Sequence, residues 1–424
     1  MQPTALGTVV LSSLLLSCSL HAAESGDSLF VSSSCTGNGI NAVCAAIKRD
    51  VPKHQSSLYV SRDGGSTWES VETLSKRGIL NAVSCSGSGT DAVCVAAGDS
   101  ISSAKPLLYS SNNGGQTWSE VAIEHTTASL LATGCTGSGT SAVCTAVGMD
   151  LKSYSPLLFV SSNGGDSWNT VTTTLEQGFF SSTSCTGTGD NTVCTAAGEL
   201  LDGSPLLYSS SDAGSTWSAV KIRVKFGGFK ATSCTGEGAK AVCTAVGEDA
   251  SHGSPLLYVS KNGGEKWRHV KTTEVEGDFY ATSCTGEGRQ VVCTAAGGDY
   301  INPALLYVST NRGKDWNFIE TSSETSLFNA ISCTGSGINA VCTAAGYSNS
   351  SNPLPLLYVS TNGGTAWNSV ETTSEQVLFS NTSCTGAGQD VLCIASGKSH
   401  SSDVPPFYLS TNRGGDWHQV VMAQ

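Results

Sequence analysis

The sequence predicts an all-β protein in which one four-stranded antiparallel sheet is repeated eight times. Three observations lead to this fold class. All eight tryptophans recur at intervals of 49 to 51 residues, from Trp68 to Trp417. Sixteen of the 17 cysteines form pairs whose members are separated by nine positions. Each copy of about fifty residues contains four short runs rich in Val, Leu, Tyr, Thr and Trp, which are typical of strands. Because so small a sheet cannot bury both of its faces alone, the copies predict a single closed ring, an eight-bladed β-propeller.

The copy that begins at residue 80 shows the order of elements. Its four strands are LNAVSC, AVCVAA, PLLYSS and TWSEVAI. The connection between the first two contains TGSG or a close variant in most copies, which predicts a two-residue type II′ turn with Gly at its first central position. This register sets the two cysteines opposite each other at a non-hydrogen-bonded pair, with Cα atoms about 4.5 Å apart. That separation allows a disulfide within each copy.

The cysteine spacing therefore predicts a disulfide framework behind an export signal. Zinc is the alternative, but zinc sites usually need closer cysteine spacing and often histidine, and no histidine recurs with the repeat. We expect no metal and no cofactor. The predicted disulfides are Cys35–Cys44, Cys85–Cys94, Cys135–Cys144, Cys185–Cys194, Cys234–Cys243, Cys284–Cys293, Cys333–Cys342 and Cys384–Cys393.

A second repeated turn joins the third and fourth strands and ends on the tryptophan. An Asp or Asn side chain is expected to accept bonds from backbone N–H groups of the turn. These residues are Asp63, Asn113, Asn163, Asp212, Asn262, Asn311, Asn362 and Asn412. Glycine supplies the backbone freedom that the turn needs, at Gly65, Gly115, Gly165, Gly214, Gly264, Gly313, Gly364 and Gly415. The tryptophan ring is expected to pack on the neighbouring sheet.

This turn resembles the Asp-box, or BNR repeat, of sialidase-like and sortilin-like propellers, xyloglucanases and photosystem II assembly factors. The resemblance covers residues 28–424, with one box in each blade, and implies that the box joins the third and fourth strands of a propeller blade. It implies no single function, because enzymes and binding proteins share the box. This chain departs from the family in having Asn at six of the eight Asp positions and a disulfide in every blade.

The N-terminus predicts export. Residues 1–23 contain a short apolar run followed by Ala22 and Ala23, which is typical of a signal peptide, although no Lys or Arg precedes the run. The protein is therefore expected to be secreted or periplasmic; lipid attachment at Cys18 is the alternative. Residues 24–424 form the propeller, with blades at approximately 28–74, 78–124, 128–174, 178–223, 227–273, 277–322, 326–373 and 377–424.

Composition restricts the partners. The net charge of −12 argues against nucleic acid and anionic membrane surfaces. No further segment is long and apolar enough to span a membrane, and we expect a monomer that binds a protein or a glycan.

The strand order places the two repeated turns on one side of the ring and the variable loops on the other, where a ligand is expected. Acidic residues follow the second strand in six blades and could bind a cation, a basic peptide or sugar hydroxyls; the alternative is a solvated charged edge. The candidates are Asp50, Asp99, Asp150, Glu199, Glu248, Asp249 and Asp299. Aromatic residues that do not follow the repeat complete the set, namely Phe179, Phe226, Tyr280, Tyr154, Tyr300 and Tyr347.

Catalysis is the alternative function. Sialidases grip the substrate carboxylate with three arginines, but here Arg62, Arg268, Arg289, Arg312 and Arg413 fall in or beside the repeated turns. Of the other three, Arg223 falls about half a ring away from Arg49 and Arg77, so they are not expected to converge on one carboxylate. A carbohydrate-active hydrolase that uses two loop carboxylates stays open. No catalytic residue is assigned.

Overall fold

The computed structural model describes residues 28–72, 78–125, 127–174, 176–272, 276–321, 325–350, 353–372, 376–399 and 404–422. Strands dominate, and the helical turns among these residues are seven short 3₁₀ turns. Within the same ranges no helix has the length and apolar character needed to cross a bilayer. The predicted all-β class is confirmed.

The strands fall into eight consecutive four-strand units, numbered here in chain order. Units 1 to 4 are β1 (Ser28–Thr36), β2 (Val43–Asp50), β3 (Gln55–Ser61) and β4 (Glu69–Val71); β5 (Gly78–Ser86), β6 (Val93–Ser100), β7 (Pro106–Ser111) and β8 (Ser119–Glu120); β9 (Ala128–Thr136), β10 (Val143–Asp150), β11 (Pro156–Ser161) and β12 (Asn169–Thr170); and β13 (Gly178–Thr186), β14 (Val193–Leu200), β15 (Pro205–Ser210) and β16 (Ser218–Ala219). Units 5 to 8 are β17 (Gly228–Thr235), β18 (Val242–Asp249), β19 (Ser254–Ser260) and β20 (Trp267–His269); β21 (Asp278–Thr285), β22 (Val292–Pro303), β23 (Leu305–Ser309) and β24 (Asn317–Phe318); β25 (Thr325–Thr334), β26 (Val341–Ser348), β27 (Pro355–Ser360) and β28 (Asn368–Ser369); and β29 (Val377–Thr385), β30 (Leu392–Ser399), β31 (Phe407–Ser410) and β32 (His418–Gln419).

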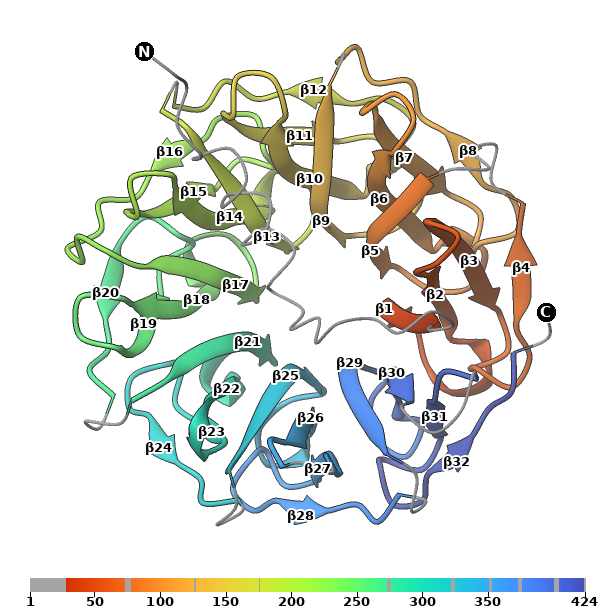
Figure 1. The fold of residues 1–424 in the computed structure, drawn as a ribbon, viewed down its shortest axis with the longest axis vertical. Coiled ribbons are helices and arrows are strands. Elements are labelled where there is room, and N and C mark those ends of the chain that lie inside the picture. Colours follow the sequence, from red (N-terminus) through yellow and green to blue (C-terminus); the bar gives the residue numbers. More distant parts are fainter. Residues whose placement is uncertain are drawn as a thin grey trace.

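Each unit is an antiparallel sheet whose strands pair in chain order. The units stand around a ring with the first strand innermost and the fourth strand outermost (Figure 1). This is the architecture of a β-propeller. Units 6 and 7 are additionally joined, because β22 extends to pair with β25 at Gly298–Leu327 and Pro303–Thr325.

Every unit carries the expected disulfide between its first two strands. The paired cysteines lie directly opposite each other, as at Cys35–Cys44, with Cα atoms 4.1 Å apart. The prediction of a two-residue type II′ turn between these strands is wrong. Six residues separate the paired Thr36 and Val43, and they contain a 3₁₀ turn at Gly39–Asn41. The loop is longer because Gly37 and Gly39 both take positive φ, 88° and 51°.

Neighbouring units are joined by hydroxyl groups on the innermost strands. The Thr or Ser after the first cysteine donates to the carbonyl of the first loop glycine of the next unit, over 2.5–2.9 Å, in all eight units. The donors are Thr36, Ser86, Thr136, Thr186, Thr235, Thr285, Thr334 and Thr385. Thr385 donates to Gly37 O and so closes the ring between unit 8 and unit 1. We call these contacts the hydroxyl ring.

The residue before the first cysteine forms a second set of bridges. In seven units its serine Oγ accepts a bond from the cysteine N–H of the following unit, as Cys85 N donates to Ser34 Oγ over 2.9 Å. Units 1 and 8 lie in separate sheets and meet through these bonds and through packing of Phe30 on Phe407. The ring therefore closes by packing of side chains and not by a shared sheet.

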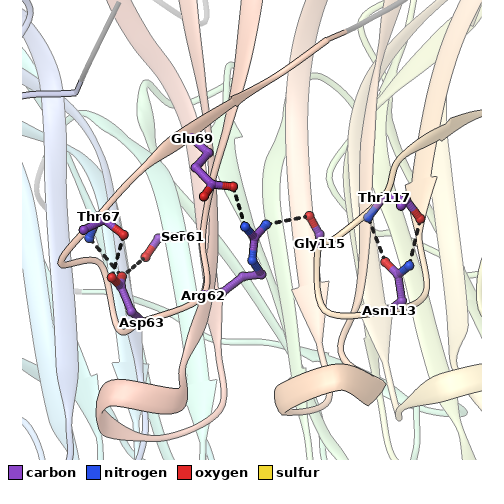
Figure 2. Close-up of polar contacts among 8 residues, drawn as sticks. All are labelled: Ser61, Arg62, Asp63, Thr67, Glu69, Asn113, Gly115 and Thr117. Atoms are coloured by element: carbon purple, nitrogen blue, oxygen red, sulfur yellow. Dashed lines mark hydrogen bonds and ion pairs between the residues drawn. The ribbon is translucent and has the colours of Figure 1, made fainter.

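The box turns are held by the Asp or Asn side chain (Figure 2). Asp63 Oδ1 accepts from Thr67 N over 2.9 Å, and Asp63 Oδ2 accepts from Thr67 Oγ1 over 2.6 Å. In unit 2 Asn113 keeps the bond from Thr117 N, at 3.0 Å, and its amide donates to Thr117 Oγ1 over 2.7 Å. Asn therefore replaces Asp by reversing one hydrogen bond. This reversal is required where the residue four positions on is a carboxylate, as in the pair Asn311–Asp315, which is 2.9 Å apart.

The tryptophan indole completes the box. Trp68 Nε1 donates to Gly65 O over 2.9 Å, and six other boxes have the same bond. In unit 8 the acceptor is Gly414, which has a positive φ of 81°. The turn glycine of unit 8 is therefore Gly414 and not the expected Gly415, because the turn lies at a fixed distance of three residues before Trp417.

Each innermost strand contains a β-bulge at the residue after its buried Phe or Leu. In unit 5, Phe229 pairs with Gly247 and Ala231 pairs with Val246, which leaves Lys230 unpaired. Glycine stands opposite the bulge in seven units, and a Cβ on Gly247 would lie 1.9 Å from Gly228 O. Unit 1 has Lys48 at the equivalent place, so its backbone accommodates a side chain. The bulge leaves the extra residue outside the ladder of hydrogen bonds and changes the direction of its side chain.

Removal of one hydroxyl from the ring tests its closure. Thr385→Val and Thr186→Val should each lower the free energy of unfolding by about 0.5–1.5 kcal/mol, because each leaves a glycine carbonyl without its donor. Urea unfolding of both variants measures this. Similar losses would show that the contact between units 8 and 1 resembles the others. A neutral Thr385→Val beside a destabilising Thr186→Val would contradict the closure described here.

The bulges predict a contrast between two units. Gly247→Ala should destabilise the protein by about 1–3 kcal/mol, because its Cβ must displace backbone. Lys48→Ala, at the equivalent place in unit 1, should change stability by less than about 0.5 kcal/mol. The denaturant midpoints of the two variants measure this difference. Equal losses of stability would argue against a steric need for glycine opposite the bulge.

Candidate functional site

The two faces of the ring differ in how far the units repeat. The turn face, formed by the first loops and the box turns, is nearly identical in all units. The loop face, formed by the connections from second to third strands and between units, is variable. Its innermost feature is the set of bulged residues, here called the bulge ring. These are Val31, Asn81, Leu131, Ser181, Lys230, Tyr280, Asn329 and Ser380.

Four members of the bulge ring have a structural role. Asn81 Nδ2 donates to Leu130 O over 2.8 Å, and Ser181 Oγ donates to Phe229 O over the same distance. Asn329 and Ser380 make the matching bonds to Phe379 O and Phe30 O. Each bond reaches the carbonyl of the buried residue beside the bulge of the next unit. These four side chains therefore hold neighbouring bulges together.

Four of the seven acidic candidates stabilise turns. Asp150 accepts from Lys152 N over 2.6 Å and from Ser153 N over 3.0 Å. Asp50 accepts from Lys53 N, Asp249 from Ser251 N, and Asp299 from Ile301 N. The Lys53 ammonium, 2.7 Å from Asp50, lowers the pKa of that carboxyl. Burial opposes ionisation of Asp150, but its backbone hydrogen bonds prevail and lower its pKa. These positions fit turn capping better than ligand binding.

Asp99 belongs to a polar network that crosses three units. It accepts from Ser129 Oγ over 2.8 Å and from Asn81 Nδ2 over 3.3 Å. Arg49 of unit 1 donates to Asn81 Oδ1 over 2.7 Å. Burial raises the pKa of Asp99, although both hydrogen bonds and the Arg49 charge oppose it. The network fixes the geometry of units 1 to 3.

The remaining acidic candidates, Glu199 and Glu248, belong to a group of residues from units 4 to 6 that lies around Lys230. Lys230 Nζ lies 2.6 Å from Asp278 Oδ2, 4.0 Å from Glu248 Oε2 and 4.4 Å from the centre of the Tyr280 ring. Burial raises the pKa of Glu199, and the charge of Glu248 raises it further; Lys230 opposes both. Burial and the Asp278 charge likewise raise the pKa of Glu248. We call Glu199, Lys230, Glu248, Asp278 and Tyr280 the acid–lysine cluster.

The sequence did not single out two members of this cluster. Lys230 and Asp278 both stand at positions where the innermost strands stop repeating, which is the signal that could have found them. Three carboxylates against one ammonium leave the cluster negatively charged when they are ionised. Such a group can accept hydrogen bonds from hydroxyl or cationic donors.

The aromatic candidates are spread over the same face. Phe226 is 56% exposed, and Tyr154 is 36% exposed on a left-handed turn residue with φ 59°. Phe179 is half-buried and pairs with Glu199. Tyr347 is only 9% exposed, which leaves little of its ring for a ligand. The side chain of Tyr300 lies outside the described residues.

Further exposed apolar residues stand on the loop face and were not expected from the sequence. They are Ile101, Ile301, Leu354 and Val404. Ile101, Leu354 and Val404 lie between second and third strands, and Ile301 lies near the end of β22. Single apolar residues at such positions give no periodic signal. With Phe226 they rim the face that carries the acid–lysine cluster.

Several arginines in or beside the repeated turns donate to backbone carbonyls of the scaffold. Arg62 Nη1 donates to Gly115 O over 3.2 Å and pairs with Glu69 (Figure 2). Arg268 donates to Gly313 O, and Arg413 to Gly388 O. In the described part of the chain, no group of three His, Cys, Asp or Glu side chains is placed to hold a metal ion.

Known proteins resemble this chain only distantly. The Sortilin-Vps10 family profile (Sortilin, neurotensin receptor 3) matches residues 255–422. No curated protein matches. The structure of YCF48 bound to D1 peptide is 14% identical, covers 78% of this chain and 92% of that chain, and has a TM-score of 0.45. Aleuria aurantia lectin in complex with α-methyl-L-fucoside is 9% identical, covers 82% and 95%, and has a TM-score of 0.41. Another structure of that lectin, described as a six-bladed β-propeller, is 10% identical with the same coverage and TM-score. At these identities the likeness concerns the fold alone.

The raised pKa of Glu199 predicts the pH dependence of stability. A carboxyl with a raised folded-state pKa favours folding below its unfolded pKa, about 4.3, and loses that contribution as pH rises through the folded pKa. Glu199→Gln should therefore melt at a higher temperature than the wild type at neutral pH, and the difference should shrink near pH 4. Thermal melts at both pH values test this, with the exposed Glu320→Gln as control. A lower melting temperature at neutral pH would contradict the assignment.

Proposed function

We propose that the chain is an exported, eight-bladed Asp-box propeller that binds a protein or glycan on its loop face. Residues 1–23 would be removed as a signal peptide, and residues 24–424 would form the mature domain. The eight disulfides are typical of an oxidising compartment, which supports export. The counting of eight blades rests on the eight four-strand units and on the contacts that close unit 8 on unit 1.

The observation that carries the proposal is the loss of repetition on the loop face. The same bulge occurs in every innermost strand, yet it presents a different environment around the ring, from Val31 to Lys230 and Tyr280. Side chains held on strands are placed more accurately than side chains on loops. A scaffold that repeats its turns but varies this ring is suited to recognition of one ligand.

The chemistry of the loop face fits a ligand with both apolar and donor groups. Phe226 and Ile301 supply exposed apolar surface, and the acid–lysine cluster supplies acceptors. A glycan offers hydroxyl donors and an apolar ring face, and a peptide offers side chains of both kinds. Both ligand classes therefore belong in the screen.

A second candidate function is glycoside hydrolysis. It is favoured by Glu199 and Glu248, whose pKa values burial raises, as a general acid requires. Turnover of a glycan that Glu199→Gln or Glu248→Gln abolishes would replace binding by catalysis as the function.

Two matched double variants test the proposed binding face. The mature protein is screened against glycan and peptide arrays, and the affinity of any ligand is measured for each variant. Phe226→Ala/Ile301→Ala removes residues that are 56% and 76% exposed on the loop face. Ile40→Ala/Ile338→Ala removes residues that are 79% and 66% exposed on the turn face.

We expect the first variant to weaken binding at least about tenfold, as loss of interface anchors does, with an unchanged melting temperature. The second variant should bind like the wild type. Loss of binding only in the turn-face variant would overturn the assignment of the binding face.

A further inference from the structure

A polar cavity lies among the inner loops of the turn face, opposite the proposed binding face. It has a volume of about 570 Å³ and is lined by residues of five consecutive units, from Thr136 of unit 3 to Ser336 of unit 7. Five of the eight units contribute to it, so the cavity extends along more than half of the inner side of the ring. Its walls are the ends of the innermost strands and the first loops. We call it the channel mouth, and its volume is in the range of small-ligand sites.

The hydroxyl ring decides which hydrogen bonds the channel mouth can make. A hydroxyl carries one proton and can also accept. Thr136, Thr186 and Thr235 line the cavity, and each uses its proton to bind the glycine carbonyl of the next unit, over 2.8–2.9 Å. These three side chains can therefore offer a ligand only acceptor lone pairs.

The other lining hydroxyls also donate their protons to oxygen atoms of the protein. Thr188 Oγ1 donates to Glu237 Oε1 over 3.0 Å, and Ser336 Oγ donates to Gln290 Oε1 over 3.4 Å. Among the lining side chains, only the amide of Gln290 has N–H groups to offer. The lining side chains therefore offer a ligand almost only acceptors.

Negative charge is concentrated on one side of this acceptor surface. Glu237 and Glu287 occupy the same loop position in neighbouring units 5 and 6, and both are exposed in the cavity. The equivalent residues of the other units are uncharged: Asn38, Ser88, Ser138, Thr188, Ser336 and Ala387. Lys240 and Arg289 lie in the adjoining 3₁₀ turns but do not line the cavity.

We propose that the channel mouth binds a protonated primary amine or guanidinium group, from a free polyamine or from a lysine or arginine side chain. Such groups have only donors and a positive charge, which complements acceptors and two carboxylates. A neutral sugar needs donors as well as acceptors. This site is separate from the loop face and does not depend on the function proposed there.

Calorimetric titration of the mature protein at low ionic strength with 1,4-diaminobutane tests the proposal. 1,4-Butanediol is the neutral control of the same length. The wild type should bind one equivalent of the diamine and none of the diol. A lysine-containing peptide blocked at both ends forms a second arm, and its binding would point to a polypeptide as the source of the amine.

Two double variants separate a local site from general attraction to a chain of net charge −12. Glu237→Gln/Glu287→Gln should weaken binding at least about tenfold, since both carboxylates of the site become neutral. Glu320→Gln/Glu371→Gln removes the same charge at exposed positions outside the cavity and should change affinity less than about twofold. The loop-face variant Phe226→Ala/Ile301→Ala should bind the diamine like the wild type.

Three results would overturn the proposal. They are no binding of the diamine by the wild type, equal binding by the Glu237→Gln/Glu287→Gln variant, and an equal loss in both double variants. Thermal melts of each variant confirm that the fold is intact. Since the loop-face ligand is tested with other probes, either hypothesis can fail without the other.

Discussion

The structure depends on a hydrogen bond between side chain and backbone that recurs at every contact between units. Apart from β25, which also pairs with β22, the first strand of each unit pairs only with the second, so its other edge offers unpaired backbone groups to the next unit. Among the described residues, a backbone ladder joins neighbouring units only between units 6 and 7. Instead, a hydroxyl such as Thr36 donates to Gly87 O, while the cysteine N–H of the next unit donates to Ser34 Oγ. Backbone groups that would otherwise be buried without partners are thereby satisfied, and the units are joined without merging their sheets. This is why a ring of separate small sheets can close on itself.

Much of this fold could be predicted from the sequence because its determinants are spaced regularly. The Cys–Cys and Trp–Trp intervals fix which strands pair and where each box turn lies. The loop type could not be derived in the same way. The midpoint between Cys35 and Cys44 is compatible with a two-residue turn, and only the positive φ of both Gly37 and Gly39 shows that the strands separate earlier. The bulges were also missed. A bulge shifts the register by one residue, and Lys230 or Tyr280 looks locally like any other strand residue.

The same shift explains why the candidate site was only partly predictable. The sequence does not show that two adjacent acidic residues, such as Glu248 and Asp249, have different environments in the fold. In the structure Asp249 caps its own turn, with Ser251 N 3.0 Å away, while Glu248 faces Lys230. Asp278 joins the cluster although it belongs to the next unit along the chain. The sequence predicted the face of the proposed site and part of its chemistry. The grouping depends on the bulge and on contacts between units, which one unit's sequence does not contain.

The two faces follow opposite rules for the same physical reason. On the turn face every unit presents a hydroxyl and a glycine carbonyl at fixed positions, and these groups form the eight bonds of the hydroxyl ring. These bonds use the hydroxyl protons and leave side-chain acceptors on this face, where two glutamates create a local negative charge. On the loop face the bulge frees one side chain per unit from the ladder, and no common bond restricts its identity. In some units this side chain bonds to the neighbouring unit, as Asn81 does. In unit 5 it is the charged Lys230, which pairs with Asp278. The units therefore repeat where the hydroxyl ring joins them and differ on the face that we propose binds a ligand.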